Sequence, residues 1–321
     1  MRRRWRSLLL GVAAMLCGLV VHAQPQSRPS DERVVIVSSD TTSAFVEVAQ
    51  VLIDGLVRDG LSRYDVRQLT TSELVSLVKA GQTPHPRVFV ALGTEASAAL
   101  ALGAGATPVL SALLPRSSFE RVLQASGRKT SSQFTALYLD QPLSRQMALI
   151  HLALPAAQRV GVLLGQESVL RAPALRSLAQ ANGLTLVEAL ADSPKTVFPR
   201  LKTLLDECDV LLALADPQVY NSNSLQNILL TTFREKVPMV AFSPAYVRAG
   251  ALMSLHVTPA QVGSQALGLV QLVLRDQTLP ASAVESRDFE VGVNEHVARS
   301  LGLTLDASAL RLELRRLERL P

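Results

Sequence analysis

The chain has 321 residues, of which 48% are hydrophobic and 18% charged, so it can bury about two domain cores and is not of disordered composition. The formal net charge is +5, but four of these charges are arginines within the first six residues. The rest is nearly neutral, and no nucleic-acid partner is expected. Only two cysteines, Cys17 and Cys208, are present, which excludes a framework of several disulfides.

The first 23 residues have the pattern of an export signal. A basic start precedes an apolar run over 8–21, and small side chains at Val21 and Ala23 suit cleavage before Gln24. The apolar run, about 14 residues, is too short for a comfortable membrane span. Leu16 before Cys17 does not fit a lipoprotein signal. We expect an exported, periplasmic protein that is cleaved near Ala23 and starts with a flexible leader over 24–32.

Strands then alternate with helices in the first half of the chain. A run over 34–37 is apolar on both faces, as a parallel strand requires, and a helix follows to about residue 58. The pattern predicts further strands at 64–69, 88–92 and 108–110. Helices are expected from 71 to 79 and after Gly93.

The alternation restarts after residue 138. Helices are expected at 142–154, 166–182, 196–205 and 224–236, and strands at 160–164, 184–188, 210–214 and 239–242. A helix over 259–275 and a strand over 289–293 follow. Two such series in tandem predict two parallel-sheet lobes. Leucines among charges after residue 297 predict an exposed amphipathic helix, with a helical tail over 305–321.

Polar side chains follow the predicted strands at their carboxyl ends, the edge at which open α/β sheets bind ligands. The candidate ligand-binding residues are Ser39, Asp40, Thr41, Thr94, Ser97, Glu167, Ser168, Asp216, Tyr220, Asn221, Ser243 and Tyr246.

Each candidate has both a binding and a structural interpretation. The free N–H groups at the start of the helix that begins near Thr94 can bind a ligand carboxylate, but ordinary helix capping uses the same residues. Asp216 can pair with an ammonium group or simply form a turn before Pro217. Tyr220 and Tyr246 can stack on a ligand or pack at the rim of a lobe.

The sequence lacks the signatures of an enzyme. The histidines at 85, 151, 256 and 296 do not have metal-ligand spacing. No Gly-x-Ser-x-Gly, His-Glu-x-x-His or phosphate-binding loop occurs. We therefore expect no catalysis, metal or cofactor. A hydrolase with an unrecognised site is kept as an alternative hypothesis.

Four segments carry a resemblance to a known family: HLALPAAQRVGVL at 151–163, VPMVAFS at 237–243, VRAGAL at 247–252 and NEHVARSLGL at 294–303. They resemble the substrate-binding family of ABC transporters that includes tryptophan- and tyrosine-type binders. The resemblance implies a type I periplasmic binding fold: α/β, with two doubly wound parallel-sheet lobes joined by a three-crossing hinge near 139–142, 253–258 and 281–288. Lobe 1 would comprise 33–139 plus 258–281, and lobe 2 would comprise 140–257 plus 282–304.

The resemblance implies a periplasmic solute-binding protein of an ABC-type uptake system, a monomer that delivers its ligand to a permease. The alternative is a ligand-sensing subunit for a membrane histidine kinase or cyclase. Basic residues are scarce at the predicted strand ends, with Arg248 the nearest. Because a multiply anionic ligand needs such residues, we expect a zwitterionic or neutral solute, such as an amino acid, whose amine Asp216 would hold.

Overall fold

The computed structural model describes residues 32–318. The expected signal peptide over 1–23 lies outside this range, as do the last three residues of the tail and all of the expected leader over 24–32 except Glu32.

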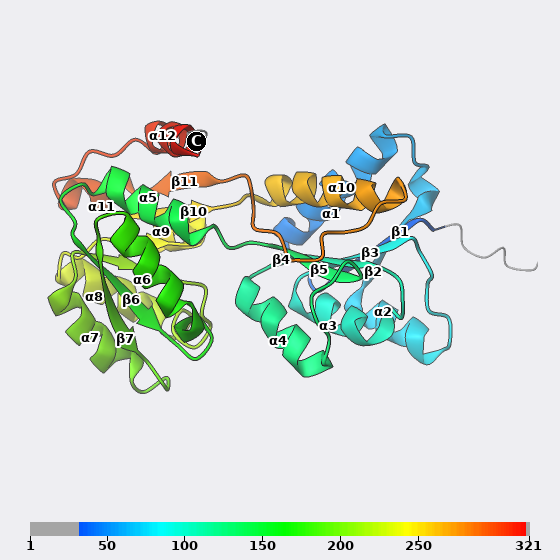
Figure 1. Ribbon diagram of the computed structural model, residues 1–321, viewed down its shortest axis with the longest axis horizontal. Helices are drawn as coiled ribbons and strands as arrows, with labels where there is room; N and C mark the ends of the chain where they lie inside the picture. The colour runs from blue at the N-terminus through cyan, green and yellow to red at the C-terminus, as the bar shows by residue number, and fades with distance from the viewer. Residues whose placement is uncertain (1–31, 319–321) are drawn as a thin grey trace, which may run out of the picture. The chain divides into compact units, whose positions relative to one another are not determined.

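The first sheet has five parallel strands and is covered by helices on both faces (Figure 1). Its order is β2-β1-β3-β4-β5, with β1 (Val34–Ser38), β2 (Val66–Thr70), β3 (Val88–Leu92), β4 (Val109–Leu114) and β5 (Phe134–Tyr138). Helix α1 (Ser43–Arg58) covers one face, and α2 (Thr71–Lys79), α3 (Thr94–Gly103) and α4 (Arg116–Ser126) cover the other.

The sequence pattern missed α4 and β5 and made β4 too short. Helix α4 buries only three side chains, those of Ser118, Phe119 and Val122, so its apolar stripe is narrow in an otherwise polar segment. Strand β4 continues to Leu114 through a β-bulge, where Leu113 has a φ of 58°. A bulge bends the strand and interrupts the alternation on which the expectation rested.

The second sheet has six strands in the order β11-β10-β9-β8-β6-β7, and only β11 is antiparallel to its neighbour. The strands are β6 (Arg159–Leu164), β7 (Thr185–Leu190), β8 (Val210–Leu212), β9 (Met239–Ala241), β10 (Met253–His256) and β11 (Glu290–Val293). The helices are α5 (Leu143–Ala153), α6 (Ala172–Ala181), α7 (Val197–Glu207), α8 (Leu225–Arg234) and α9 (Pro244–Ala249). Strand β10 occupies 253–256, which the sequence assigned to a crossing.

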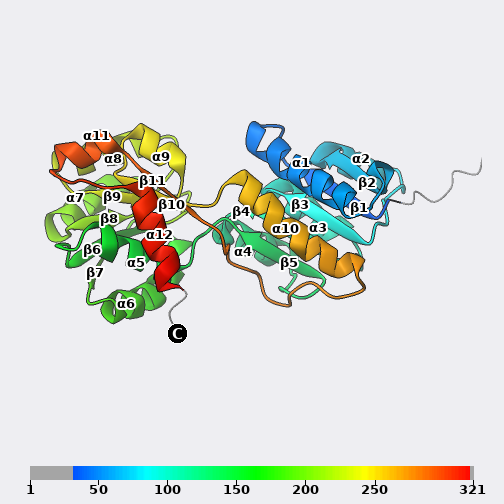
Figure 2. The same cartoon turned by 90° about the horizontal axis from the view of Figure 1, so that it is seen from above.

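The chain passes three times between the regions of the two sheets. It does so between β5 and α5, between β10 and α10 (Pro259–Leu274), and before β11. Figures 1 and 2 show α10 beside α1, and Val262, Ala266 and Val270 of α10 are buried in the core of the first sheet. The α/β class, the two lobes and the three crossings are thus confirmed; the lobe boundaries given above stay a prediction.

The end of the described chain differs from the single exposed helix that was expected. Two helices follow β11, α11 (Glu295–Ser300) and α12 (Ala307–Leu317). Helix α12 packs against α5 and β11 and buries Leu314, while Leu312 remains exposed. The expectation failed because the spacing of apolar residues cannot show whether a neighbouring surface is available to the helix.

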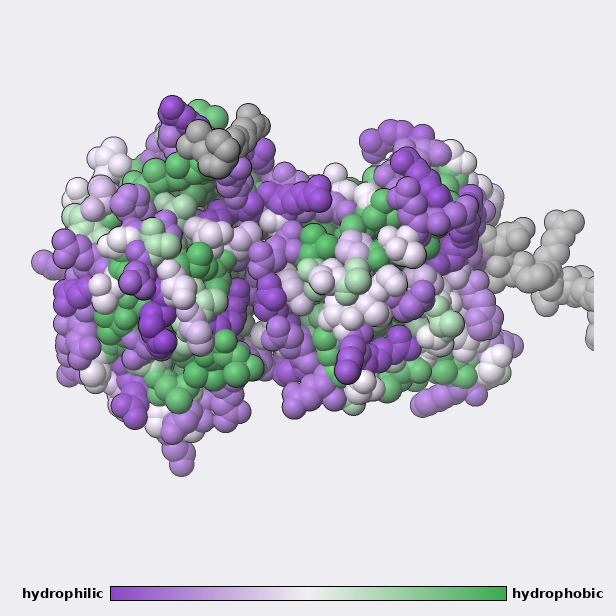
Figure 3. Space-filling model, viewed as in Figure 1, coloured by the Kyte–Doolittle hydropathy of each residue, from purple (hydrophilic) through white to green (hydrophobic). Residues whose placement is uncertain are grey.

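The surface is mixed in character. On the face in Figure 3, hydrophobic residues form several patches among hydrophilic residues. No helix within residues 32–318 is both long enough and apolar enough to cross a membrane.

Candidate ligand-binding site

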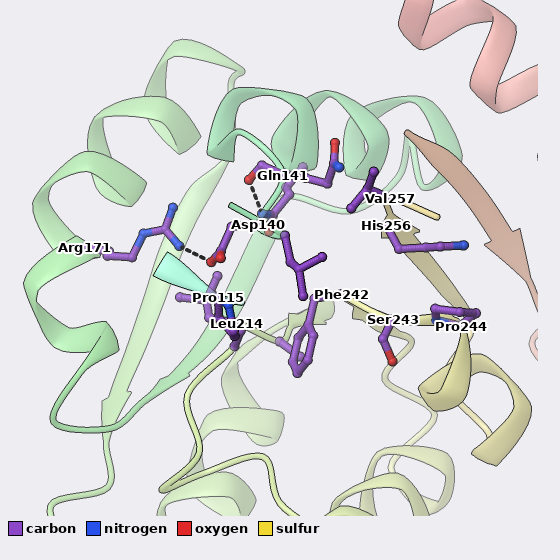
Figure 4. Close-up of a pocket in the computed structure, with 14 residues that line it drawn as sticks. Pro115, Asp140, Gln141, Arg171, Leu214, Phe242, Ser243, Pro244, His256 and Val257 are labelled. Carbon is purple, nitrogen blue, oxygen red and sulfur yellow. Dashed lines mark hydrogen bonds and ion pairs between the residues drawn. The ribbon is translucent and has the colours of Figure 1, made fainter. Parts of the chain in front are cut away.

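A cavity of about 210 Å³ lies where the ends of β8, β9 and β10 meet the first two crossings (Figure 4). Its walls come from both lobes, because Pro115 follows β4 of the first sheet and Ala215 follows β8 of the second. The lining residues are Pro115, Leu139, Asp140, Gln141, Gln146, Arg171, Ala213, Leu214, Ala215, Phe242, Ser243, Pro244, His256 and Val257.

Much of this wall is apolar and is centred on Phe242. The centre of the Phe242 ring lies 4.8 Å from the centre of the Tyr246 ring. It lies 6.3 Å from the centre of the Tyr220 ring, and those two rings pack edge to face. These two tyrosines are buried, so they support the Phe242 ring from behind. Such a wall suits an apolar or planar part of a ligand.

One ion pair, between Arg171 and Asp140, supplies charge to the cavity (Figure 4). The side chains are 18% and 7% exposed, and Arg171 Nη1 lies 3.4 Å from Asp140 Oδ1. The other Asp140 oxygen accepts the backbone N–H of Arg116 at 2.7 Å, at the start of α4. Asp140 is therefore anchored, whereas the long contact to Arg171 is weaker than a charge-assisted hydrogen bond of about 2.8 Å.

Burial lowers the pKa of the Arg171 guanidinium, and the charge of Asp140 opposes that effect. Within residues 32–318 the guanidinium makes a single polar contact, the one to Asp140. Because arginine carries five N–H donors, its remaining donors are available to an anionic ligand group.

Neutral polar side chains line the rest of the cavity wall. Gln141 donates to the carbonyl oxygen of Asp288 at 3.2 Å, and Gln146 donates to the carbonyl oxygen of Gln141 at 2.9 Å. His256 Nδ1 shares a hydrogen bond of 3.0 Å with the Ser254 hydroxyl. Burial lowers the pKa of His256, so the imidazole is neutral at pH 7 and can donate or accept.

The twelve side chains predicted from the sequence all lie in the described part of the chain, and of these only Ser243 lines the cavity. Asp216 is 1% exposed. It accepts the backbone N–H and hydroxyl of Ser168 at 2.9 and 2.7 Å and the N–H of Gln218 at 3.0 Å. Its carboxylate thus ties the loop after β6 to the loop after β8, and its position does not support the expected contact with a ligand amine.

The predicted tyrosines and Asn221 also have structural roles. Burial raises the pKa of Tyr220 and raises that of Tyr246 to about 12. Neither ring lines the cavity directly. The Asn221 side chain accepts the N–H groups of Asn223 and Ser224 and donates to the carbonyl oxygen of Pro217, so it shapes the turn before α8.

The candidates of the first sheet form the start of α3 and the loop beside it. The Ser39 hydroxyl accepts the N–H of Ala96 at 2.9 Å, and the Ser97 hydroxyl donates to the carbonyl oxygen of Gly93 at 2.7 Å. Asp40 accepts the N–H of Thr42, and both Asp40 and Thr41 are exposed. Thr94 lines a groove between α3 and α4 instead. Ser39 thus satisfies an N–H group at the start of α3, and Asp40 satisfies one in the turn before α1.

Two contacts connect α4 to loops of the second sheet. Arg121 Nε lies 3.1 Å from Glu167 Oε1, and the Ser117 hydroxyl donates to the carbonyl oxygen of Ala215 at 3.2 Å. The predicted Glu167 therefore forms an ion pair with an arginine of the other lobe.

Sequence reasoning missed Asp140, Gln141 and Arg171, and it was wrong that basic residues are scarce at these edges. Arg116 begins the helix after β4, and Arg171 lies in the short 3-10 helix (Ser168–Arg171) after β6. Asp140 and Gln141 follow β5, a strand that was not expected. The available signal was the pair Asp140 and Gln141, which follow Tyr138 two and three residues later.

Among residues 32–318, no group of three or more histidine, cysteine, aspartate or glutamate side chains is placed to hold a metal ion.

The sequence pattern of the family described as ABC transporter substrate binding protein matches residues 31–313. No curated protein sequence matches the chain.

Solved structures share the fold at low identity. A substrate binding protein with adhesive properties from Clostridium difficile, in its ligand-free, open form, is similar with a TM-score of 0.68 and 16% identity, over 86% of this chain and 96% of that one. A conserved domain protein from Vibrio cholerae is similar with a TM-score of 0.60 and 21% identity, again over 86% of this chain and 96% of that one. An ABC domain from Streptococcus pneumonia, in complex with L-Trp, is similar with a TM-score of 0.59 and 16% identity, over 86% of this chain and 97% of that one.

The family match covers most of the chain, and the two-lobed fold with a cavity at the strand ends is what binding of a small molecule requires. The proteins of this family are solute-binding proteins and not enzymes. The chain belongs to the ABC transporter substrate binding protein family.

Proposed function

We propose that the protein binds a zwitterionic amino acid with an apolar side chain between its lobes and delivers it to an ABC permease from the periplasm. The observation that carries this proposal is the pairing of Arg171 with Asp140 beside the apolar wall around Phe242.

The size of the cavity favours a small solute. Its volume of about 210 Å³ lies below the roughly 300–1,000 Å³ of pockets that hold drug-sized ligands. Hinge closure around the solute is the usual mechanism of such receptors, and the cavity borders the first two crossings.

The charges favour a zwitterion. A ligand carboxylate can accept from the free donors of Arg171, and Asp140 Oδ1 can then accept from a ligand ammonium. Both ligand charges are paired in that arrangement without a net charge being added to the buried site. A ligand with two anionic groups would place one of them near Asp140, which opposes its binding. This assignment moves the amine contact from Asp216 to Asp140.

The test is a screen by thermal shift, followed by calorimetry. Purified protein without the first 23 residues is screened against the twenty amino acids, ribose, phosphate and succinate, with L-tryptophan first because one structural neighbour is in complex with L-Trp. A ligand at a hundredfold excess over its Kd stabilises the folded state by about 2.7 kcal/mol. We expect stabilisation by one or more apolar amino acids.

The variant Arg171→Gln then locates the carboxylate. We expect it to weaken amino-acid binding by about ten- to a hundredfold, the effect of losing a charged hydrogen bond. Arg176→Gln is the matched control, because Arg176 lies on the next helix, is 63% exposed and pairs with Glu188. Equal affinities in the two variants, or a screen answered only by ribose, phosphate or succinate, would contradict the proposal.

A further inference from the structure

A buried arginine of α5 lies where two of the crossings and the C-terminal helix meet. The Arg145 side chain is 7% exposed. Its guanidinium donates to the Gln141 side-chain oxygen in the first crossing and to the carbonyl oxygens of Ser286 and Arg287, at 3.1 and 3.3 Å, in the third. It also forms an ion pair with Glu318 directly after α12. Arg145 thus bonds to three separate parts of the chain.

Helix α12 makes further contacts to the end of the third crossing. Arg311 Nη1 lies 2.9 and 3.0 Å from the two carboxylate oxygens of Glu290. Arg315 Nη2 lies 3.7 Å from Asp288 Oδ1. The guanidinium carbons of Arg145 and Arg315 lie 4.4 and 5.4 Å from the centre of the Phe289 ring, which is buried. Figure 2 shows α12 beside β11 and α5.

The second crossing joins the same network through the start of α10. Gln261 donates to Glu290 at 3.0 Å, so Glu290 binds both α10 and α12. Gln265 donates to the Ser286 hydroxyl at 3.0 Å and accepts the backbone N–H of Arg287 at 2.8 Å. All three crossings are therefore connected to one another and to α12.

We propose that α12 is a brace for the hinge and that Arg145 is the positioning residue through which it acts. Removing Glu318 leaves the buried guanidinium short of its only carboxylate partner among residues 32–318, and a buried charge without a partner is unfavourable. Arg145 then loses its fixed position, and the segment at 284–291 is held less firmly. Because Gln141 also lines the cavity, the brace orients one wall of the binding site.

This inference rests on the proposed function only in that the crossings serve as the hinge for ligand binding. Its test therefore uses the ligand-free protein, so the absence of an amino-acid ligand would leave the result unaffected. The variants are Glu318→Gln and a chain ending at Thr304. Glu313→Gln is the matched control, because Glu313 lies on α12 and pairs with Arg316, away from the crossings.

The first measurement is amide hydrogen exchange by mass spectrometry. We expect exchange at 139–142 and 284–291 to become about tenfold faster in Glu318→Gln, and faster still in the shortened chain. Strands β6, β8 and β9 should keep their protection, and Glu313→Gln should match the original protein. If the shortened chain does not fold, Glu318→Gln decides the question by itself.

The second measurement reports on the hinge directly. Spin labels at Glu47→Cys on α1 and Lys202→Cys on α7, both exposed positions, give a distance distribution between the lobes in a Cys208→Ala background. Loss of the brace should broaden this distribution in Glu318→Gln and leave it unchanged in Glu313→Gln. Unchanged exchange at the crossings, an unchanged distribution, or loss of protection spread evenly through β6, β8 and β9 would overturn the proposal.

Discussion

Replacing Asp216 by alanine distinguishes the structural role of this carboxylate from the binding role that the sequence suggested. The change removes the acceptor for three donors, namely the N–H and hydroxyl of Ser168 and the N–H of Gln218. The Ser168 hydroxyl can turn toward another acceptor, but the two backbone N–H groups cannot. Each buried donor left without a partner costs about 1–3 kcal/mol.

The loss for two amides is therefore at most about 2–6 kcal/mol. It lies in the lower part of that range because the Gln218 amide is only partly buried and water can enter the space. We expect Asp216→Ala to lower the free energy of unfolding by about 2–4 kcal/mol. The assay is urea unfolding followed by far-UV circular dichroism. Asp192→Ala is the control, because Asp192 is exposed and, among residues 32–318, its side chain accepts a hydrogen bond from the Thr196 hydroxyl alone. A surface change of this kind stays within about 0.5 kcal/mol.

The sequence interpretation predicts the opposite pattern, with folding intact and a weaker hold on an amine-bearing ligand. A loss of stability below about 1 kcal/mol, together with weakened amino-acid binding, would refute the structural assignment of Asp216 and restore that interpretation.

Two further predictions concern packing and pH. Gly263→Ala would place a Cβ 2.8 Å from the side chain of Val51 and should lower stability by about 1–3 kcal/mol. On the same helix, Gly268→Ala meets no atom within 4 Å and should raise stability by about 0.5–1 kcal/mol; thermal melts that shift in the same direction would contradict this contrast. Burial raises the pKa of the Cys208 thiol from 9.0 to about 11, so the folded thiol ionises less readily than the unfolded one. Its contribution to stability is complete below about pH 9 and is lost as the pH rises toward 11, and the urea midpoint should fall less over that range in Cys208→Ala than in the original protein.

The fold class could be predicted from the order of residues along the chain. Runs such as 34–37, which are apolar on both faces, suit strands covered by helices on both sides, and their alternation with helices implies parallel sheets. The positions of most helices and strands followed from the same periodicity. The two tandem series of strands and helices predicted the two lobes, and the resemblance in the second half of the chain added the three crossings. These features depend on local patterns that can be read along the chain.

Which polar residues face the cavity depends on contacts between distant parts of the chain, and these contacts are visible only in the folded protein. Asp216 and Arg171 both follow strands of the second sheet, yet Asp216 is satisfied by Ser168 and Gln218, whereas Arg171 faces the cavity with one weak partner. Whether a side chain at a strand end binds a ligand or its own fold depends on donors that lie about 50 residues away along the chain. Likewise, α12 packs one face against α5 and β11 because the chain returns to that surface after β11, and no local pattern encodes that return.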